Sequence, residues 1–291
     1  MCCLFGMIDY RGHFTGRQKT RFLSVLAAEC EARGTDAAGV AYCAGGALRV
    51  YKRPVPAHAL GFRIPDDVSV VLGHTRMTTQ GSQEKNYNNH PFLGNAGGRR
   101  FALAHNGVLY NDQLLRTSLR LPSTKIETDS YVAVQLLERQ KALDFASLKY
   151  MAEQVEGSFT FTLMDEANRW YLVKGDNPLC LYHYPRLGVY LYASTEEILR
   201  KALRKQGLGR PKRIAGISWK SRRTGRFTEA PLRRTSGTGY RRCIRRPLGG
   251  TVRRVTLNGS TGGIWRLLPS GTAMIPCASA ICSTRALHWT M

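Results

Sequence analysis

The stretch MCCLFGMID (residues 1–9) places two cysteines directly behind the first methionine, at the head of a short apolar run. This run predicts a buried strand over residues 2–9. Asp9 and Arg11 interrupt it before the apolar core of a secretory leader could form. We therefore expect a cytoplasmic protein whose eight cysteines are reduced.

A cysteine at position 2 gains a chemical use that an internal cysteine lacks once Met1 is removed. Cys2 then carries a thiol and a free α-amine, whose ordinary pKa of about 7.7–8.0 suits a general base. The amine can activate the thiol as a nucleophile without a histidine partner. On MCC alone, however, the better explanation is that Cys2 and Cys3 are small apolar side chains of a first strand.

The pattern further along the chain alternates strands with blocks of helix. Residues 17–33, 126–140 and 144–153 have helical spacing. Successive strand patterns run from 157 to 193, and residues 195–206 predict a last helix. Strands in hairpins with helices inserted in blocks predict an α+β fold. The apolar stretches fall far short of the roughly 20 residues of a membrane span, so no membrane association is expected.

Four further motifs indicate what the cysteines at the start of the chain do. They are RGTDAAGVAY (33–42), GHTRMTTQG (73–81), AHNGVLYN (104–111) and ETDSYVAVQLL (127–137). Together and in this order they resemble the class II glutamine amidotransferases, which are N-terminal-nucleophile (Ntn) hydrolases. The resemblance covers roughly residues 2–205 and is strongest to the glutaminase domain of glutamine:fructose-6-phosphate aminotransferases. It implies a four-layer αββα sandwich of two antiparallel sheets, with Cys2 at the mouth between them.

The resemblance assigns catalysis to three residues. Cys2 is the nucleophile that forms a thioester, and the Asn106 amide and Gly107 N–H form the oxyanion hole. Without the resemblance, His-Asn-Gly is simply a tight turn. The implied reaction converts the side-chain amide of L-glutamine to glutamate and ammonia.

Three more residues are expected to hold the substrate. Arg76 suits the glutamine α-carboxylate because its planar fork binds a carboxylate bidentately. Asp129 pairs with the α-ammonium, and Thr79 helps to position the substrate. In isolation, Arg76 is equally explained as a surface ion-pair residue.

Another four residues are expected to hold the site residues in place without contacting the substrate: Arg33, Gly34, Asp36 and Gln80. The chain departs from the family pattern at Cys3, where the family has glycine, at Met77, where it has tryptophan, and at Gln80, where it has histidine. Cys3 leaves open whether a second thiol contributes, but only Cys2 becomes terminal when Met1 leaves. We therefore assign the nucleophile to Cys2.

Three histidines could be interpreted as metal ligands or as members of a catalytic triad: His74, His90 and His105. The N-terminal amine already supplies a base, so we expect each histidine to make a structural hydrogen bond. We expect no metal and no cofactor.

The end of the chain differs in composition from the rest. From Pro211 to Met291 it has 14 Arg and 2 Lys against one acid, Glu229, and so carries most of the net charge of +23. We expect an amidotransferase domain over residues 2–214 and a basic, disordered tail over 215–291. The tail is either a basic arm for an anionic partner or the product of a frameshift, and we favour the frameshift. It lacks the interleaved aromatics of a nucleic-acid platform, so nucleic acid is not the expected partner.

A frameshifted tail predicts few contacts with the domain and an open sheet edge where the last strands should pair. The residues after Gln206 are too few for a domain that uses ammonia, so any acceptor is expected on a partner synthase subunit. Two alternatives stay open. One is an Ntn hydrolase of another amide, and the other is a non-catalytic glutamine-binding regulatory subunit.

Overall fold

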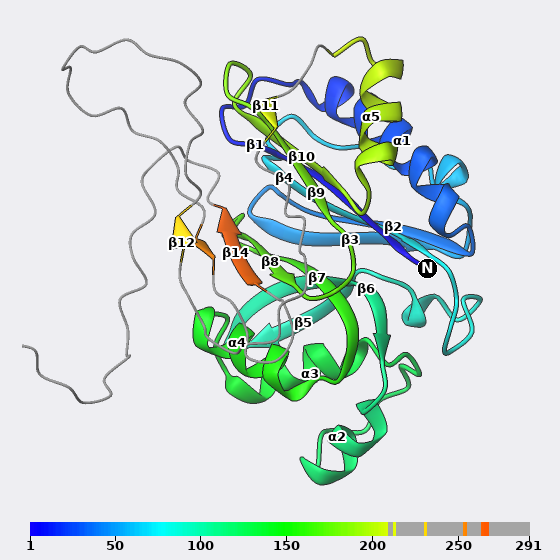
Figure 1. Ribbon diagram of the computed structural model, residues 1–291, viewed down its shortest axis with the longest axis vertical. Coiled ribbons are helices and arrows are strands. Elements are labelled where there is room, and N and C mark those ends of the chain that lie inside the picture. Colours follow the sequence, from blue (N-terminus) through cyan, green and yellow to red (C-terminus); the bar gives the residue numbers. More distant parts are fainter. Residues whose placement is uncertain (209–211, 214–229, 232–252, 255–262, 268–291) are drawn as a thin grey trace, which may run out of the picture.

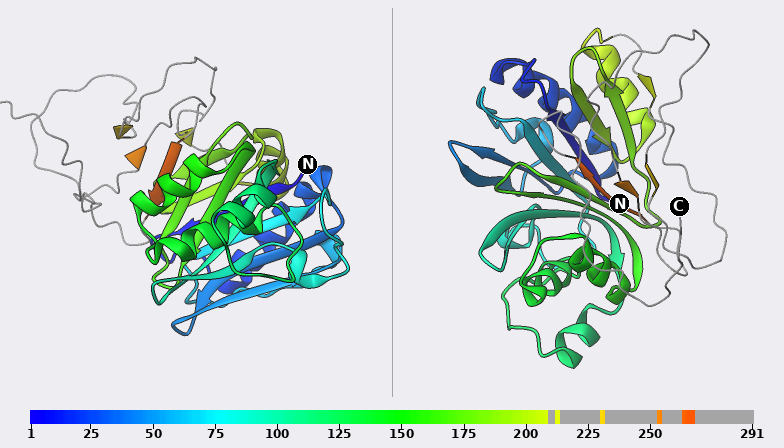
Figure 2. Two further views of the ribbon diagram at one scale, coloured as in Figure 1. Left: turned by 90° about the horizontal axis from the view of Figure 1, so that it is seen from below. Right: turned by 90° about the vertical axis from the view of Figure 1, so that its left-hand side faces the viewer.

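The computed structural model describes residues 1–208 and four short segments, 212–213, 230–231, 253–254 and 263–267. Two antiparallel sheets face each other, and helices cover the outer face of each (Figures 1 and 2). The expected α+β, four-layer αββα sandwich is thus confirmed.

The first sheet contains the N-terminal strand near its middle. Its order is β11 (Lys212–Arg213), β9 (Cys180–Tyr184), β10 (Val189–Ala193), β1 (Cys3–Asp9), β4 (Val70–Arg76), β2 (Ala37–Ala44) and β3 (Ala47–Arg53). Helices α1 (Gly16–Cys30) and α5 (Glu196–Lys205) pack on its outer face. The Thr15 and Thr195 side chains cap the two helices at their N-termini.

The second sheet carries the 104–111 motif. Its order is β14 (Gly263–Leu267), β8 (Trp170–Lys174), β7 (Gly157–Asp165), β6 (Arg99–Leu109) and β5 (Phe92–Ala96). Helices α3 (Tyr131–Gln140) and α4 (Phe145–Gln154) lie on its outer face, and the short α2 (Asp112–Ser118) projects from the body (Figure 1). A separate pair, β12 (Ala230–Pro231) and β13 (Arg253–Arg254), completes the described strands.

Strand alternation divides the core into three layers. Leu4, Leu72, Ala104 and Trp170 belong to the layer between the sheets. Their strand neighbours point outward, to the core beneath α1 and α5 or to the core beneath α3 and α4. Successive side chains on a strand point to opposite faces of the sheet. The position of a residue along its strand therefore predicts the layer of the core to which its side chain belongs.

The expected helix at 126–140 begins later, at Tyr131. Residues 126–130 form a loop instead, and within it the Asp129 carboxylate accepts a hydrogen bond from the backbone N–H of Leu109. A carboxylate that binds the backbone of another strand competes with helix formation at its own position.

The expected open edge is not found at β8. Gly263–Leu267 pairs with Lys174–Trp170 over five positions as β14. On the first sheet, β11 pairs with two residues of β9. Apart from these short segments, the prediction of a disordered tail over 215–291 falls outside the described residues. No helix among the described residues is long and apolar enough to cross a membrane.

Candidate active site

The two cysteines at the N-terminus face different layers. Cys3 is fully buried in the core beneath α1, where its thiol lies against that of Cys30. Leu4 faces the second sheet, and by alternation Cys2 does too. The Cys2 Sγ lies 3.4 Å from the backbone nitrogen of Met77, just after β4. Only the Cys2 thiol of this pair is therefore directed between the sheets.

Charged groups surround the Cys2 thiol. Burial raises its pKa, and the Asp129 carboxylate acts in the same direction. The Met77 backbone hydrogen bond, the chain amino group and the Arg76 guanidinium act to lower the pKa, but burial outweighs them. The thiol is therefore protonated at neutral pH.

The first two residues are held in place by Arg33. Its Nε donates to the Cys2 carbonyl oxygen at 3.0 Å. Met1 itself is 63% exposed. An exposed first residue followed by a small one leaves the Met1–Cys2 peptide bond open to cleavage.

Arg76 ends β4 and is buried. Its two terminal nitrogens donate to Asn89 Oδ1 at 2.7 Å and to the carbonyl oxygens of Gln80 and Gly81 at 2.7 and 2.9 Å. Burial lowers its pKa, and the nearby Cys2, Asp36 and Asp129 act to raise it. The guanidinium charge therefore acts on the Cys2 thiol and on both carboxylates. Asn89 was not among the expected residues.

The loop before β2 supports the end of β4. The Asp36 N–H donates to the Arg76 carbonyl oxygen at 3.0 Å, and the Thr78 N–H donates to Asp36 Oδ2 at 2.6 Å. A Cβ on Gly34 would come within 2.4 Å of the Arg76 carbonyl carbon, so only glycine permits this approach. Asp36 thus ties the two segments together. Thr79 follows on an exposed turn.

Gln80 bridges two of the motifs. Its Nε2 donates to the Glu127 carbonyl oxygen at 3.0 Å. Gln80 therefore connects the 73–81 motif to the segment that carries Asp129.

Asn106 lies on β6 and is fully buried. Ala104 belongs to the layer between the sheets, so Asn106 faces the same layer as Cys2. Neither Nδ2 nor Oδ1 of its amide has a hydrogen-bond partner among the described residues. A buried amide without partners costs free energy, so this one marks a place where a polar ligand atom would be stabilised.

The next residue, Gly107, has a φ of 151°, a conformation that side chains disfavour. A Cβ there would lie 1.9 Å from the Ser158 carbonyl oxygen. The motif therefore requires glycine at this position for steric reasons.

Asp129 is buried immediately before α3. Its Oδ2 accepts from the Leu109 N–H at 2.7 Å, and its Oδ1 accepts from Ser130 Oγ at 3.3 Å. These bonds hold the Asp129 carboxylate against the backbone of Leu109, two residues after Gly107 along β6. Arg76, at the end of β4, and Asp129, in the loop before α3, both act electrostatically on Cys2.

The three histidines are buried near one another. His74 Nε2 lies 2.9 Å from the His105 carbonyl oxygen, and His105 Nδ1 lies 2.8 Å from Ser130 Oγ. Burial lowers the pKa of His74 to about 3 and that of His105 to about 4, so both are neutral at pH 7. His90 does not make the structural hydrogen bond that we expected, because its two ring nitrogens have no partner among the described residues. Its ring packs instead against the rings of His74 and Phe92, with centroid distances of 4.2 and 4.3 Å.

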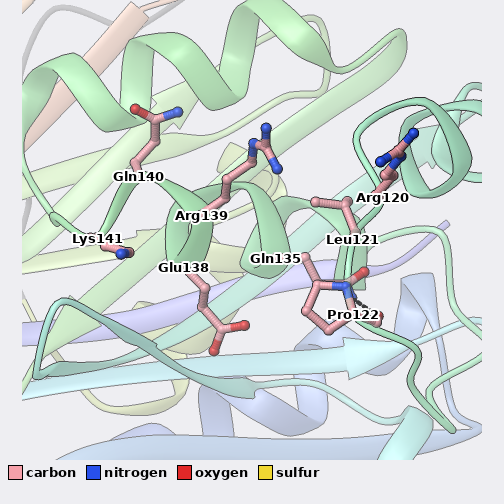
Figure 3. Close-up of a pocket in the computed structure, with 8 residues that line it drawn as sticks. All are labelled: Arg120, Leu121, Pro122, Gln135, Glu138, Arg139, Gln140 and Lys141. Atoms are coloured by element: carbon pink, nitrogen blue, oxygen red, sulfur yellow. Dashed lines mark hydrogen bonds between the residues drawn. The ribbon is translucent and has the colours of Figure 1, made fainter.

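A separate pocket of about 550 Å³ lies along α3 and the turn that follows α2 (Figure 3). Its lining residues are Arg120, Leu121, Pro122, Gln135, Glu138, Arg139, Gln140 and Lys141. Two of these residues are joined by a hydrogen bond, in which the Gln135 Nε2 donates to the Pro122 carbonyl oxygen at 2.7 Å. None of the expected site residues lines this pocket.

Comparison with known proteins identifies similar chains. Residues 74–201 match the family model of a glutamine amidotransferase domain. The glutamine–fructose-6-phosphate aminotransferase of Bacillus thuringiensis subsp. konkukian is 33% identical over 175 residues, which is 57% of this chain and 29% of that protein. The enzyme of the same name from Streptococcus pyogenes serotype M3 is 30% identical over 62% of this chain and 30% of its own length. The chain thus spans less than a third of these relatives.

The fold has solved counterparts. The glutamine phosphoribosylpyrophosphate amidotransferase of B. subtilis superimposes with a TM-score of 0.57, at 21% identity, over 69% of this chain and 43% of that one. Sequence and fold therefore agree with the expected resemblance to class II glutamine amidotransferases, which are enzymes, and that expectation is confirmed.

Proposed function

From its likeness to class II glutamine amidotransferases, we propose that this chain hydrolyses the side-chain amide of L-glutamine to glutamate and ammonia. The nucleophile is Cys2 after removal of Met1. The ammonia passes to an acceptor on a partner protein or is released.

The proposed reaction has two stages. The free α-amine of Cys2 takes the thiol proton, and Sγ attacks the glutamine Cδ to give a tetrahedral oxyanion. Collapse of this intermediate breaks the C–N bond, transfers the proton to the leaving nitrogen and leaves a thioester. Water then attacks the thioester, releases glutamate and restores the thiol and amine.

The observation that carries this proposal is that three interacting groups, on Cys2, Arg76 and Asp129, accompany an Asn106 amide that faces the same layer as Cys2. The Cys2 thiol, the Arg76 guanidinium and the Asp129 carboxylate interact electrostatically. The Asn106 amide faces the same layer without a partner. A positive and a negative charge fit the α-carboxylate and α-ammonium of an amino acid, and a free amide donor fits an oxyanion.

The raised pKa of Cys2 supports an amine base. A thiol that is protonated at neutral pH gains from a neighbouring base whose ordinary pKa is about 7.7–8.0. The buried His74 and His105 are poorer bases, because burial lowers the pKa of each to about 4 or below.

The test is a substrate panel with purified chain whose N-terminus has been sequenced. Ammonia and glutamate released from L-glutamine, and not from L-asparagine, would support the proposal. Turnover of another acyl amide without turnover of glutamine would favour the alternative Ntn hydrolase. Saturable glutamine binding without ammonia release, in a chain that lacks Met1, would favour a regulatory subunit.

We also propose that residues 2–214 form the amidotransferase domain and that residues 215–291 arise from a frameshift. The composition of the tail supports this, because 14 Arg and 2 Lys stand against Glu229 from residue 211 onward. Pairing of β14 with β8 weighs against it. Resequencing the gene around codons 209–216 decides the matter, since an intact frame there would refute the frameshift.

A further inference from the structure

The loop between β8 and β9 reaches the peptide that joins Asn106 to Gly107. Asn177, which is 8% exposed, donates from Nδ2 to the Asn106 carbonyl oxygen at 2.8 Å. The proposed mechanism makes no use of this side chain.

The Asn106–Gly107 peptide has a defined direction on β6. The His105 carbonyl oxygen points away from the neighbouring strand β7, toward His74, and the Leu109 N–H also points away from β7, toward Asp129. The Tyr110 N–H, by contrast, donates to the carbonyl oxygen of Glu156, just before β7. In an antiparallel ladder these directions alternate, so the Asn106 C=O points toward β7 and the Gly107 N–H points away from it.

We propose that Asn177 is a positioning residue for the oxyanion hole, an inference that rests on the proposed function. A peptide unit is planar, so a hydrogen bond that fixes the Asn106 C=O also fixes the direction of the Gly107 N–H on its opposite side. A donor on the carbonyl oxygen also polarises the peptide and makes its N–H a stronger donor.

Asn177 is itself held from the same sheet. The Thr160 hydroxyl donates to the Asn177 carbonyl oxygen at 2.6 Å, and Thr160 is the ladder partner of Asn106. A Cβ on Gly107 would come within 2.7 Å of Asn177 Nδ2. The amide therefore packs closely against the peptide that it binds, with little freedom to turn elsewhere.

The test compares Asn177→Asp, which keeps the shape but replaces the donor with a charged carboxylate oxygen, with Pro178→Ala at the exposed neighbouring position. We expect Asn177→Asp to lower kcat for glutamine about 10- to 100-fold with KM within about twofold of the parent, because only the transition state uses the oxyanion hole. A glutamine analogue with an aldehyde in place of the amide should lose affinity by a similar factor, while glutamate should not. Pro178→Ala should match the parent in kcat, in KM and in both affinities.

A second readout does not depend on turnover. In protein labelled with ¹⁵N-glycine, Asn177→Asp should shift the Gly107 amide resonance and speed its hydrogen exchange. An unchanged Gly107 amide would overturn the inference, and so would a fall in affinity for glutamate equal to that for the aldehyde. A parent chain that releases no ammonia would refute the proposed function, and the Gly107 amide would still decide whether Asn177 positions the peptide.

Discussion

The two faces of the strands carry different kinds of residue at neighbouring positions. Three adjacent pairs show the contrast, with the residue that faces the opposite sheet named first: Cys2 and Cys3, Arg76 and Thr75, Asn106 and His105. The first members lie in the layer between the sheets, where polar groups are charged or lack partners. The second members are buried under helices, where Thr75 Oγ1 donates to the Cys30 carbonyl oxygen at 3.2 Å and His105 Nδ1 lies 2.8 Å from Ser130 Oγ.

The contrast teaches that burial alone does not mark the site. Both members of the Arg76 and Asn106 pairs are almost fully buried. What differs is the layer that they face: Arg76 and Asn106 face the space between the sheets, where Arg76 brings a charge and the Asn106 amide lacks a partner, whereas Thr75 and His105 face the helices. Each pair therefore contains its own control, since a substitution at the second position perturbs the same strand without touching the proposed chemistry.

The largest expected effect separates the two cysteines. Cys2→Ala should lower ammonia release by at least about 10³-fold, since no other group supplies the nucleophile. Cys3→Ala should keep activity within a few-fold of the parent and cost mainly stability, because its thiol only fills the core beneath α1. Steady-state assays on both variants decide this. Loss in both, or in Cys3→Ala alone, would break the comparison.

The next effect separates Asn106 from His105. Asn106→Ala should lower kcat about 10²- to 10³-fold with little change in KM, as for other oxyanion donors. His105→Gln should retain kcat in the folded protein and lower its melting temperature, because it disturbs the contact with Ser130 Oγ. Equal losses of kcat at the two positions would contradict the assignment.

A smaller effect separates Arg76 from Thr75. Arg76→Lys should raise KM for glutamine at least about tenfold, because lysine keeps the charge but loses the bidentate fork. Thr75→Val should leave KM unchanged and cost about 1 kcal/mol of stability through the lost hydroxyl bond to Cys30. Titration of initial rates with glutamine measures both. An unchanged KM in Arg76→Lys would remove Arg76 from the substrate site.

The smallest effect concerns acid stability. Burial lowers the pKa of His105 to about 4, below its ordinary value of about 6.5 in the unfolded chain. The unfolded state therefore binds more protons, and the stability that this neutral histidine contributes is full above pH 6.5 and falls as the pH drops toward 4. The melting temperature of the parent should thus fall more between pH 7.5 and pH 5 than that of His105→Gln. Parallel curves would contradict a buried neutral His105.

Much of the site could be predicted from the sequence because its motifs fix local structure. HNG requires glycine for steric reasons, and the strand pattern of β6 places Asn106 opposite to His105. The start of α3 could not be predicted, because helical spacing over 126–140 says nothing of the long-range bond from Leu109 to Asp129. Asn89 and Asn177 were missed for the same reason. Each acts through one hydrogen bond to a residue distant in sequence, and asparagine is common in loops.

The central claim is that Cys2, as a free N-terminal residue between the sheets, attacks the glutamine amide. It is tested most directly with a glutamine analogue that carries a diazoketone in place of the side-chain amide, followed by peptide mass mapping. The account predicts one adduct, on the thiol of Cys2, in a peptide that lacks Met1, and protection from labelling by excess glutamine. An adduct on Cys3 or on another cysteine, or full activity in a chain that retains Met1, would contradict it.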